Sequence, residues 1–160
     1  RLNCEALCAV THMVLPYMAD NGRILQFASS AAFLPQPRFA IYAATKSFVL
    51  SYSRALNVEL KSRRICVTAV CPGPVKTAFF DTAGAFSHIP LYKRLSMADP
   101  VKVVRKAIRD SAAGRSVSVY GPLMKLFSFF AKLLPHSLIL KGWEALDMRA
   151  AAQNTAPPQE

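Results

Sequence analysis

The 160-residue sequence lacks the turn with which many proteins cradle a pyrophosphate. It holds only six glycines and none of them are clustered, so no G-x-G-x-x-G or related glycine-rich turn is present. Turns of that kind bind phosphate through backbone N–H groups at a helix N-terminus. By itself, this chain is therefore expected to bind a dinucleotide poorly or not at all.

Closely paired cysteines and grouped histidines are also missing. A zinc site needs spacings such as C-x-x-C, and no metal site is expected here. We expect the cysteines to be small buried side chains. No secretory signal is present, which favours a reducing, cytoplasmic compartment. The four cysteines are Cys4, Cys8, Cys66 and Cys71, and the three histidines are His12, His88 and His136.

Acidic residues are scarce. Nine Asp and Glu stand against 20 Lys and Arg, giving a formal net charge of +11. The basic residues are scattered and not interleaved with aromatic residues, so nucleic-acid binding is not expected. Hydrophobic residues make up 52% of the chain, which is enough for the core of one domain at most.

The most informative positive signal is Tyr42 followed four residues later by Lys46, within an apolar, periodic stretch. This spacing places both side chains on one helix face, one turn apart. A lysine charge at that distance lowers the pKa of a phenol below its usual value near 10. A tyrosine tuned in this way gives or takes a proton near neutral pH. The spacing is common on surface helices, so its surroundings decide the interpretation.

Two predicted strands surround this helix. Residues 23–28 read as a short buried strand that ends at Ser29, thirteen residues before Tyr42. Residues 65–70 are rich in β-branched side chains and lead into a Pro-Gly loop at 71–77. Loops at the carboxyl ends of strands are where open α/β sheets bind ligands.

This order of helix, strand, serine, Tyr-Lys helix, strand and Pro-Gly loop resembles the carboxyl-terminal half of the short-chain dehydrogenase/reductase family. The resemblance is good over residues 1–80 and weaker over 86–146. It implies a catalytic tetrad of Asn, Ser, Tyr and Lys at Asn3, Ser29, Tyr42 and Lys46. Ser29 fits the spacing from both Gly22 and Tyr42, whereas its neighbour Ser30 fits neither.

The resemblance also implies a cofactor, NAD or NADP, and a role for each residue. Tyr42 would be the general acid or base, Ser29 would bond the substrate oxygen, and Lys46 would bond the nicotinamide ribose. Asn3 would hold a water that links Lys46 to solvent. The segment facing the nicotinamide would comprise Pro72, Gly73, Val75 and Thr77, with Tyr42 and Lys46 also contacting the cofactor.

The expected fold is α/β, a partial doubly wound (Rossmann-type) parallel sheet with flanking helices, truncated at its N-terminus and followed by a C-terminal helical extension. The expected divisions are a half-domain over residues 1–121, an amphipathic extension over 122–149 and a disordered tail over 150–160. The missing phosphate turn indicates a fragment of a longer protein, or else a half-domain that pairs with another chain.

Further elements follow from local patterns. A long helix is expected over residues 40–62, with a buried stripe and an ordinary Glu59–Arg63 ion pair. By resemblance, its 42–62 segment forms a homo-oligomer interface. Asp99 and Pro100 should open another helix that ends near Gly114, and residues 116–120 should form the last strand. The first stripe comprises Phe48, Tyr52, Ala55 and Leu56, and the second helix carries Val101, Val104 and Ile108.

Two apolar segments have open interpretations. Phe79, Phe80, Phe86 and Tyr92 either line an apolar substrate pocket or pack structurally. Residues 122–146 carry Lys125 and Lys132 and are interrupted by Pro135, so they do not form the uncharged apolar stretch of about 20 residues that spans a membrane. They fit a peripheral membrane contact, a cap over an apolar pocket or a dimer contact equally well.

Three functions follow from this sequence. The first is an NAD(P)-dependent oxidoreductase that interconverts a carbonyl and a secondary alcohol on a small apolar substrate, steroid-like or 3-oxoacyl-like. The complete protein would be the enzyme, and this fragment alone would be inactive. The second is a non-catalytic half-domain that binds a partner. The third is a membrane-surface module built on residues 122–146, which would make a cytoplasmic protein membrane-peripheral.

Overall fold

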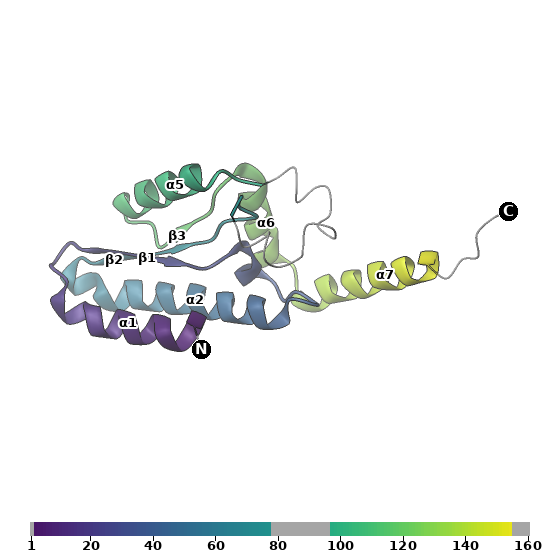
Figure 1. Ribbon diagram of the computed structural model, residues 1–160, viewed down its shortest axis with the longest axis horizontal. Coiled ribbons are helices and arrows are strands. Elements are labelled where there is room, and N and C mark those ends of the chain that lie inside the picture. The colour runs from purple at the N-terminus through teal and green to yellow at the C-terminus, as the bar shows by residue number, and fades with distance from the viewer. Residues whose placement is uncertain (1, 78–96, 155–160) are drawn as a thin grey trace.

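The computed structural model describes residues 2–77 and 97–154. Helices cover both faces of a small sheet, with α1 and α2 on one face and α5 on the other (Figure 1). The strands are β1 (Arg23–Phe27), β2 (Cys66–Val70) and β3 (Val117–Ser118). The α-helices are α1 (Leu7–Val14), α2 (Ala40–Glu59), α5 (Pro100–Ala112), α6 (Pro122–Leu133) and α7 (His136–Asn154).

All described strands run parallel, in the order β1-β2-β3. Arg23 pairs with Cys66 and Phe27 with Val70, so the two longer strands are in register along their whole length. Parallel pairing requires a crossover between strands, which α2 and α5 supply. The α/β fold with flanking helices is therefore confirmed.

The core lies on both sides of β2. Val67, Ala69 and Val70 are at most 1% exposed, as expected for a parallel strand covered on both faces. On the α2 side Ala69 joins one hydrophobic cluster, and on the α5 side Val70 packs with Val103 and Ala107. The α2-side cluster comprises Ala28, Ala32, Val49, Leu50, Ala69 and Cys71.

A buried polar chain fastens both helices of one layer to β1. Gln26 Nε2 donates to Thr11 Oγ1 of α1 at 3.1 Å, and Ser53 Oγ of α2 donates to Gln26 Oε1 at 2.6 Å. All three residues are buried. Because a buried amide without partners is costly, this pairing fixes α1 and α2 relative to the strand.

The N-terminal helical segment, Leu2 to Tyr17, has three different backbone forms. A π-helical turn, η1 (Leu2–Ala6), precedes α1, and a 3-10 turn, η2 (Leu15–Tyr17), follows it. Pro16 lies in η2, where a proline is expected to end an α-helix. π-Helical turns are rare and occur frequently at functional sites.

The predicted buried stripe of α2 is only partly correct. Leu56 is buried, but Phe48 is 40% exposed and Ala55 is also exposed. The face against the sheet carries Ala43, Val49, Leu50, Ser53 and Leu56 instead. Phe48 and Ala55 of the predicted stripe lie outward, and the Phe48 ring stacks on the half-buried Tyr52 at 5.9 Å between centroids. A periodic pattern identifies a face, but the packing decides which face turns inward.

The expected Glu59–Arg63 ion pair is replaced by another. Arg63 lies in η4 (Leu60–Arg63), a 3-10 turn that ends α2 and changes the helical spacing. Its guanidinium donates to the carbonyl oxygens of Leu15 at 3.0 Å and of Met18, and pairs with Asp20 at 3.4 Å. This arginine therefore binds the end of α1 to the end of α2.

The predicted start of α5 is confirmed, but its apolar stripe does not face the sheet. Asp99 Oδ1 accepts from the backbone N–H of Val101 at 2.7 Å, and Pro100 is the first helical residue. Val101, Val104 and Ile108 are 41–55% exposed. The buried side is Val103, Ala107, Asp110 and Ser111. Because two of these four buried residues are polar, a hydrophobicity pattern does not identify this face as the buried one.

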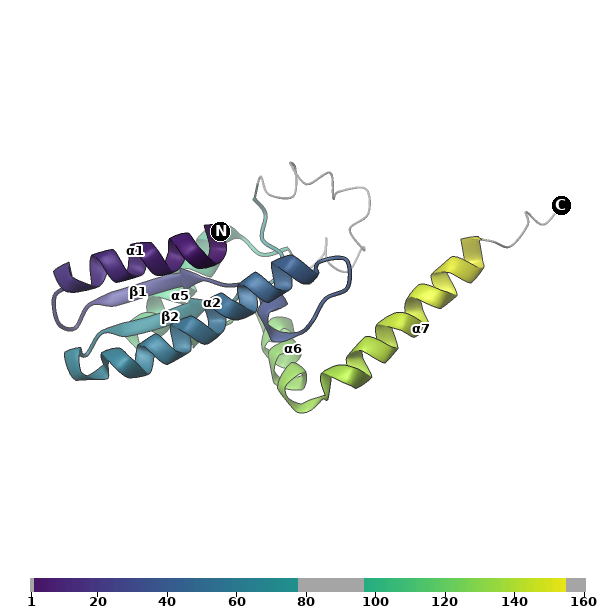
Figure 2. The same cartoon turned by 90° about the horizontal axis from the view of Figure 1, so that it is seen from below.

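The C-terminal segment forms two helices. α6 lies across the carboxyl ends of the strands, and α7 projects away from the body of the molecule (Figures 1 and 2). Within residues 2–77 and 97–154, no single helix is long and apolar enough to cross a membrane. α6 and residues 136–145 pass that test only when joined across a 112° bend. α7 continues to Asn154, so residues 150–154 are helical where a disordered tail is predicted, since they are rich in alanine.

Candidate functional site

The carboxyl ends of β1 and β2 carry two loops that bond to each other. Ser29 follows β1 and begins the 3-10 helix η3 (Ser30–Phe33). The backbone N–H of Ser30 donates to the carbonyl oxygen of Pro72 at 2.8 Å, which joins the serine loop to the Pro-Gly loop. Ser29 Oγ accepts from the backbone N–H of Ala31 at 3.2 Å. One lone pair of this oxygen is occupied, and its hydroxyl proton stays available to donate.

Tyr42 and Lys46 lie one turn apart on α2, as their spacing predicts. Lys46 Nζ is 5.7 Å from the centroid of the Tyr42 ring. The same ammonium donates to the carbonyl oxygen of Phe27, the last residue of β1, at 2.9 Å. Lys46 therefore links the first half of α2 to the strand end that leads into Ser29. Phe39 also contacts the Tyr42 ring edge-on at 6.4 Å between centroids.

Burial lowers the pKa of Lys46 below its ordinary value, with the nearby Cys71 acting in the opposite direction. An ammonium has three N–H donors. Only one of them is used by Phe27 in the hydrogen bonds of the described residues. The amine can therefore hold a further oxygen ligand beside the tyrosine.

Asn3 reaches α2 one residue away from Lys46. Its Nδ2 donates to Thr45 Oγ1 at 3.2 Å, and Thr45 Oγ1 in turn donates to the carbonyl oxygen of Tyr42 at 2.9 Å. Asn3 and Lys46 line one groove of about 540 Å³ between the N-terminal helix and β1. Thr45 did not emerge from the sequence, because a threonine inside a helix carries no signal of such a role.

The segment predicted to face a nicotinamide is braced by its neighbours. Gly73 packs against α6 so closely that a Cβ atom there would lie 2.7 Å from Met124 Sδ. Val75 forms a parallel bridge with Ala98, and Thr77 is exposed at the end of the described segment. The missing Cβ of this glycine thus lets the Met124 side chain pack close to the loop. The segment's own carbonyl and hydroxyl groups remain suited to a ribose or a carboxamide.

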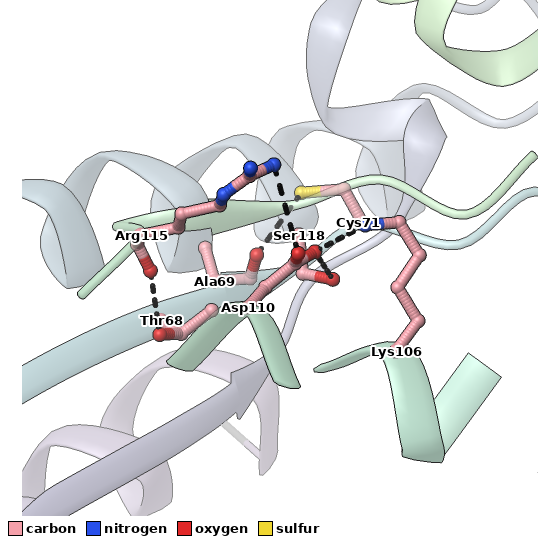
Figure 3. A network of polar contacts seen from close by, with 7 residues as sticks. All are labelled: Thr68, Ala69, Cys71, Lys106, Asp110, Arg115 and Ser118. Atoms are coloured by element: carbon pink, nitrogen blue, oxygen red, sulfur yellow. Dashed lines mark hydrogen bonds and ion pairs between the residues drawn. The ribbon is translucent and has the colours of Figure 1, made fainter. Parts of the chain in front are cut away.

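A charged network joins α5 to β3, the strand that bonds to the start of the Pro-Gly loop (Figure 3). Asp110 of α5 is 6% exposed, and its Oδ2 accepts from Lys106 Nζ at 2.5 Å and from Ser118 Oγ at 2.6 Å. Arg115 lies 3.7 Å away from Oδ1. Burial opposes ionisation of this carboxyl, but the hydrogen bonds from Lys106 and Ser118 and the two positive charges outweigh it and lower its pKa.

Cys71 connects that network to the Pro-Gly loop. Its backbone N–H donates to the carbonyl oxygen of Ser118 at 2.8 Å, directly before Pro72. Burial raises the pKa of its thiol to about 12, so the group is neutral and unreactive at physiological pH. The other three cysteines are half-buried, and all four are free thiols.

Some predicted residues lie outside the described part of the chain. Phe79, Phe80, Phe86, His88 and Tyr92 belong to residues 78–96, so their role stays a prediction. No group of three or more His, Cys, Asp or Glu side chains that could hold a metal ion occurs within residues 2–77 and 97–154.

A family model for short chain dehydrogenases matches residues 1–87, more than half of the chain. The chain belongs to the short-chain dehydrogenase family. The four predicted tetrad residues, Asn3, Ser29, Tyr42 and Lys46, all lie within the match, as do the loop residues Pro72 to Thr77.

Named relatives of this short-chain dehydrogenase chain include two very-long-chain 3-oxoacyl-CoA reductases. The mouse (Mus musculus) protein is 42% identical and the zebrafish (Danio rerio) protein 40% identical over 78 residues. That match covers 48% of this chain and 25% of each reductase.

A solved structure resembles nearly the whole chain. The short-chain dehydrogenase from Sphingobium yanoikuyae in complex with NADPH is 26% identical, with a TM-score of 0.66. The similarity covers 99% of this chain and 56% of that structure. The described helices and strands therefore form a Rossmann-type arrangement of the family, α6 and α7 included.

Proposed function

We propose that this chain carries the catalytic residues of an NAD(P)-dependent oxidoreductase that interconverts a carbonyl and a secondary alcohol. The observation that carries the proposal is the Tyr42–Lys46 pair, with Lys46 Nζ 5.7 Å from the tyrosine ring and bonded to the end of β1. This pair lies beside the serine loop, at the sheet edge where α/β folds bind ligands.

The residues of this edge fit the nicotinamide-ribose part of a dinucleotide. Lys46 keeps N–H donors free for a ribose hydroxyl, and Thr77 presents an exposed hydroxyl on the loop after β2. The relative from Sphingobium yanoikuyae was solved with NADPH. A bound nicotinamide cofactor supplies or accepts the hydride. The sequence holds no glycine-rich turn for the pyrophosphate, so we propose that this part of the cofactor is bound outside the chain.

The proton in this reaction is assigned to Tyr42. In reduction its phenol donates a proton to the substrate oxygen, and in oxidation its phenolate accepts one. Lys46 supplies positive charge beside the ring. Ser29 donates its hydroxyl proton to the same substrate oxygen and stabilises the charge that develops there. Ser29 Oγ accepts from the Ala31 N–H, which leaves its own proton available for this bond.

Asn3 is assigned a positioning role. In the proposal, it stays bonded to Thr45 and holds a water in the groove that it shares with Lys46. Such a water would return protons from solvent to Lys46. Asn3 lies in the π-helical turn, and its side chain reaches α2 through the bond to Thr45.

We further propose an apolar substrate, 3-oxoacyl-like or steroid-like. Two relatives that are about 40% identical over the matched segment bear the name very-long-chain 3-oxoacyl-CoA reductase.

We also propose the division of the chain at residue 121, since α6 begins at Pro122 directly after the last strand and its loop.

The decisive experiment compares Tyr42→Phe with the unchanged protein, each extended upstream of Arg1 to the full reading frame. We expect the variant to bind NADPH or NADH normally, as measured by cofactor fluorescence, because the phenol oxygen is only one of several contacts. Reduction of a 3-oxoacyl-CoA should fall by at least about 10²-fold, the usual contribution of a general acid.

Tyr52→Phe on the same helix is the matched control, since Tyr52 lies ten residues after Tyr42 and stacks on Phe48. It should keep its activity. Retained turnover in Tyr42→Phe would refute the assignment. If neither the extended protein nor this chain binds a cofactor, the second candidate, a non-catalytic half-domain that binds a partner, is favoured. The observation behind that alternative is the absence of a phosphate-binding turn.

A further inference from the structure

The outward face of α6 is apolar, the reverse of what a helix at a water-exposed surface normally shows. On its inward side, Ala131 is buried and Met124 packs against Gly73. The opposite side exposes large apolar residues, each 48–61% accessible to solvent. These residues are Leu123, Leu126, Phe129, Phe130 and Leu133. Four of them recur at intervals of three and four, which places them along a single face.

The apolar surface continues into the next helix. Leu134 and Leu138 are 46% and 56% exposed, and Trp143 is 37% exposed. α7 extends away from the sheet and its covering helices, as both views show (Figures 1 and 2). The α6–α7 surface, comprising the five exposed α6 residues with Leu134, Leu138 and Trp143, therefore has no cover from the described core.

Positive charge lies along the edge of this surface. Lys125 and Lys132 are seven residues apart on α6, which puts them on one flank, and both are exposed. α6 contains no acidic residue. At the bend between the helices, Arg54, Lys132 and His136 line a cavity of about 450 Å³. The side chains of these three residues form no hydrogen bond or ion pair with the described residues.

We propose that the α6–α7 surface docks on a lipid bilayer that contains anionic phospholipids. Helices that lie in a membrane interface combine an apolar face that enters the acyl boundary with flanking lysines that meet the headgroups. A tryptophan is a common residue at that depth. Arg54 and Lys132 at the bend provide positive charge for a lipid phosphate. This docking does not depend on the proposed oxidoreductase activity.

The geometry favours the membrane surface over a span. α6 has 12 residues, and at about 1.5 Å per residue it is too short for a hydrocarbon core of about 30 Å. The 112° bend prevents α6 and α7 from crossing as one rod.

Charge favours a bilayer over a second copy of the chain. A second copy would bring the same lysines to the interface, where α6 has no acidic residue to pair with them and the adjoining half of α7 has only Glu144. Like charges placed against each other oppose association. Anionic headgroups supply the complementary charge, and each lysine near such a surface strengthens binding severalfold.

The test is flotation of the purified protein with vesicles of two compositions, phosphatidylcholine alone and a 7:3 mixture of phosphatidylcholine and phosphatidylglycerol. We expect flotation with the mixture, much less with phosphatidylcholine, and release by 1 M salt. Trp143 is the single tryptophan of the chain, so its fluorescence reports on α7 directly. Its emission should shift to shorter wavelength when the mixed vesicles are added.

Two variants separate the apolar and the charged contributions. Lys125→Gln with Lys132→Gln should weaken binding to the mixed vesicles about 30-fold, from the effect of two lysines. Leu126→Gln with Phe130→Gln should abolish flotation with either composition. The matched control is Val101→Gln with Ile108→Gln, which replaces equally exposed apolar residues on α5. This control should bind as the unchanged protein does.

Each other outcome overturns the proposal. If the unchanged protein does not float with either vesicle composition, bilayer docking is excluded. Equal loss in the α5 control shows that general hydrophobicity is responsible. Retention of the protein in vesicles after 1 M salt and alkaline carbonate indicates a span. The unchanged protein could instead self-associate without floating. If Leu126→Gln with Phe130→Gln abolished that self-association, the surface would be assigned to a second copy.

Discussion

Asp110 is a buried carboxylate on a helix face that otherwise packs small or apolar side chains against β2 and β3. Its partners come from three places: Lys106 one turn earlier, Ser118 on β3 and Arg115 in the loop between them. A buried charge is tolerated only when it is paired and hydrogen-bonded. This residue therefore holds α5 against the strand that supports the Pro-Gly loop.

We predict that Asp110→Asn lowers the free energy of unfolding by about 2 kcal/mol at pH 7, since it removes charge-assisted hydrogen bonds. The folded pKa of Asp110 lies below its unfolded value of about 3.9. Its contribution is therefore full above the unfolded pKa and is lost as the pH falls through the folded pKa. Urea denaturation followed by circular dichroism should show the difference between variant and unchanged protein shrinking from pH 5 towards pH 2.

The control for Asp110 is Asp99→Asn on the same helix. Asp99 is exposed and caps the N-terminus of α5, a position that asparagine serves equally well. Its replacement should change the unfolding free energy little at any of these pH values. A pH-independent loss in Asp110→Asn would show that the effect arises from packing and not from the ionised carboxyl.

At the scale of elements, α6 acts as the outer support of the candidate site. It follows the last strand, crosses the carboxyl ends of the sheet and contacts the Pro-Gly loop through Met124 and Gly73 (Figure 1). The missing Cβ of Gly73 lets the helix lie this close. A Cβ added at Gly73 should thus displace α6, although Met124 is 51 residues away in sequence.

We predict that Gly73→Ala lowers the unfolding free energy by 1–2 kcal/mol, roughly the usual cost of overpacking. The new Cβ would lie 2.7 Å from Met124 Sδ and 2.9 Å from its Cγ, so the side chain or α6 must move. In a double-mutant cycle, Gly73→Ala should cost about 1 kcal/mol less when Met124→Ala is also present. Chemical denaturation of the four proteins measures this coupling.

Gly142→Ala is the control for Gly73→Ala, and it should stabilise the protein instead of destabilising it. A Cβ at Gly142 meets no described atom within 4 Å, and the residue lies inside α7. Alanine should therefore stabilise α7 by roughly 0.5–1 kcal/mol through helix propensity. If the two glycine variants behaved alike, close packing would not explain Gly73.

At the scale of the whole molecule, α2 presents an apolar stripe to solvent while its other side packs on the sheet. Ile41 is 84% exposed, and Phe48 stacks on Tyr52 along the same side. The 42–62 segment is proposed as a homo-oligomer contact, and this outward stripe supports that proposal. Phe48 and Ala55 of the stripe predicted from sequence thus turn away from the monomer core, whereas Leu56 is buried in it.

We predict that Phe48→Glu reduces the oligomeric mass of the protein, measured by size-exclusion chromatography with light scattering. A charge buried at the centre of a contact is costly to pair or desolvate. Val58→Glu is the matched control, because Val58 is 61% exposed on α2 but lies off the stripe. It should leave the mass unchanged. A monomeric unchanged protein would rule out α2 as an oligomer interface.

The sequence determined the local elements and the family by itself. The Tyr42–Lys46 spacing, the β-branched strand at 65–70 and the Asp99-Pro100 helix start all depend on neighbours within a few residues. These features were predicted correctly because short-range geometry dictates them. The roles of Asn3, Ser29, Tyr42 and Lys46 rest on that same spacing and stay predictions.

The tertiary structure alone decided which faces are buried and which distant groups meet. Val101, Val104 and Ile108 form a good apolar stripe, yet Asp110 and Ser111 are buried in their place because Lys106, Arg115 and Ser118 converge on the carboxylate. Thr45 joins Asn3 to the Tyr42 helix, and Met124 meets Gly73, across long sequence separations. Such pairings depend on how the helices pack on the sheet, a long-range outcome that no local pattern encodes.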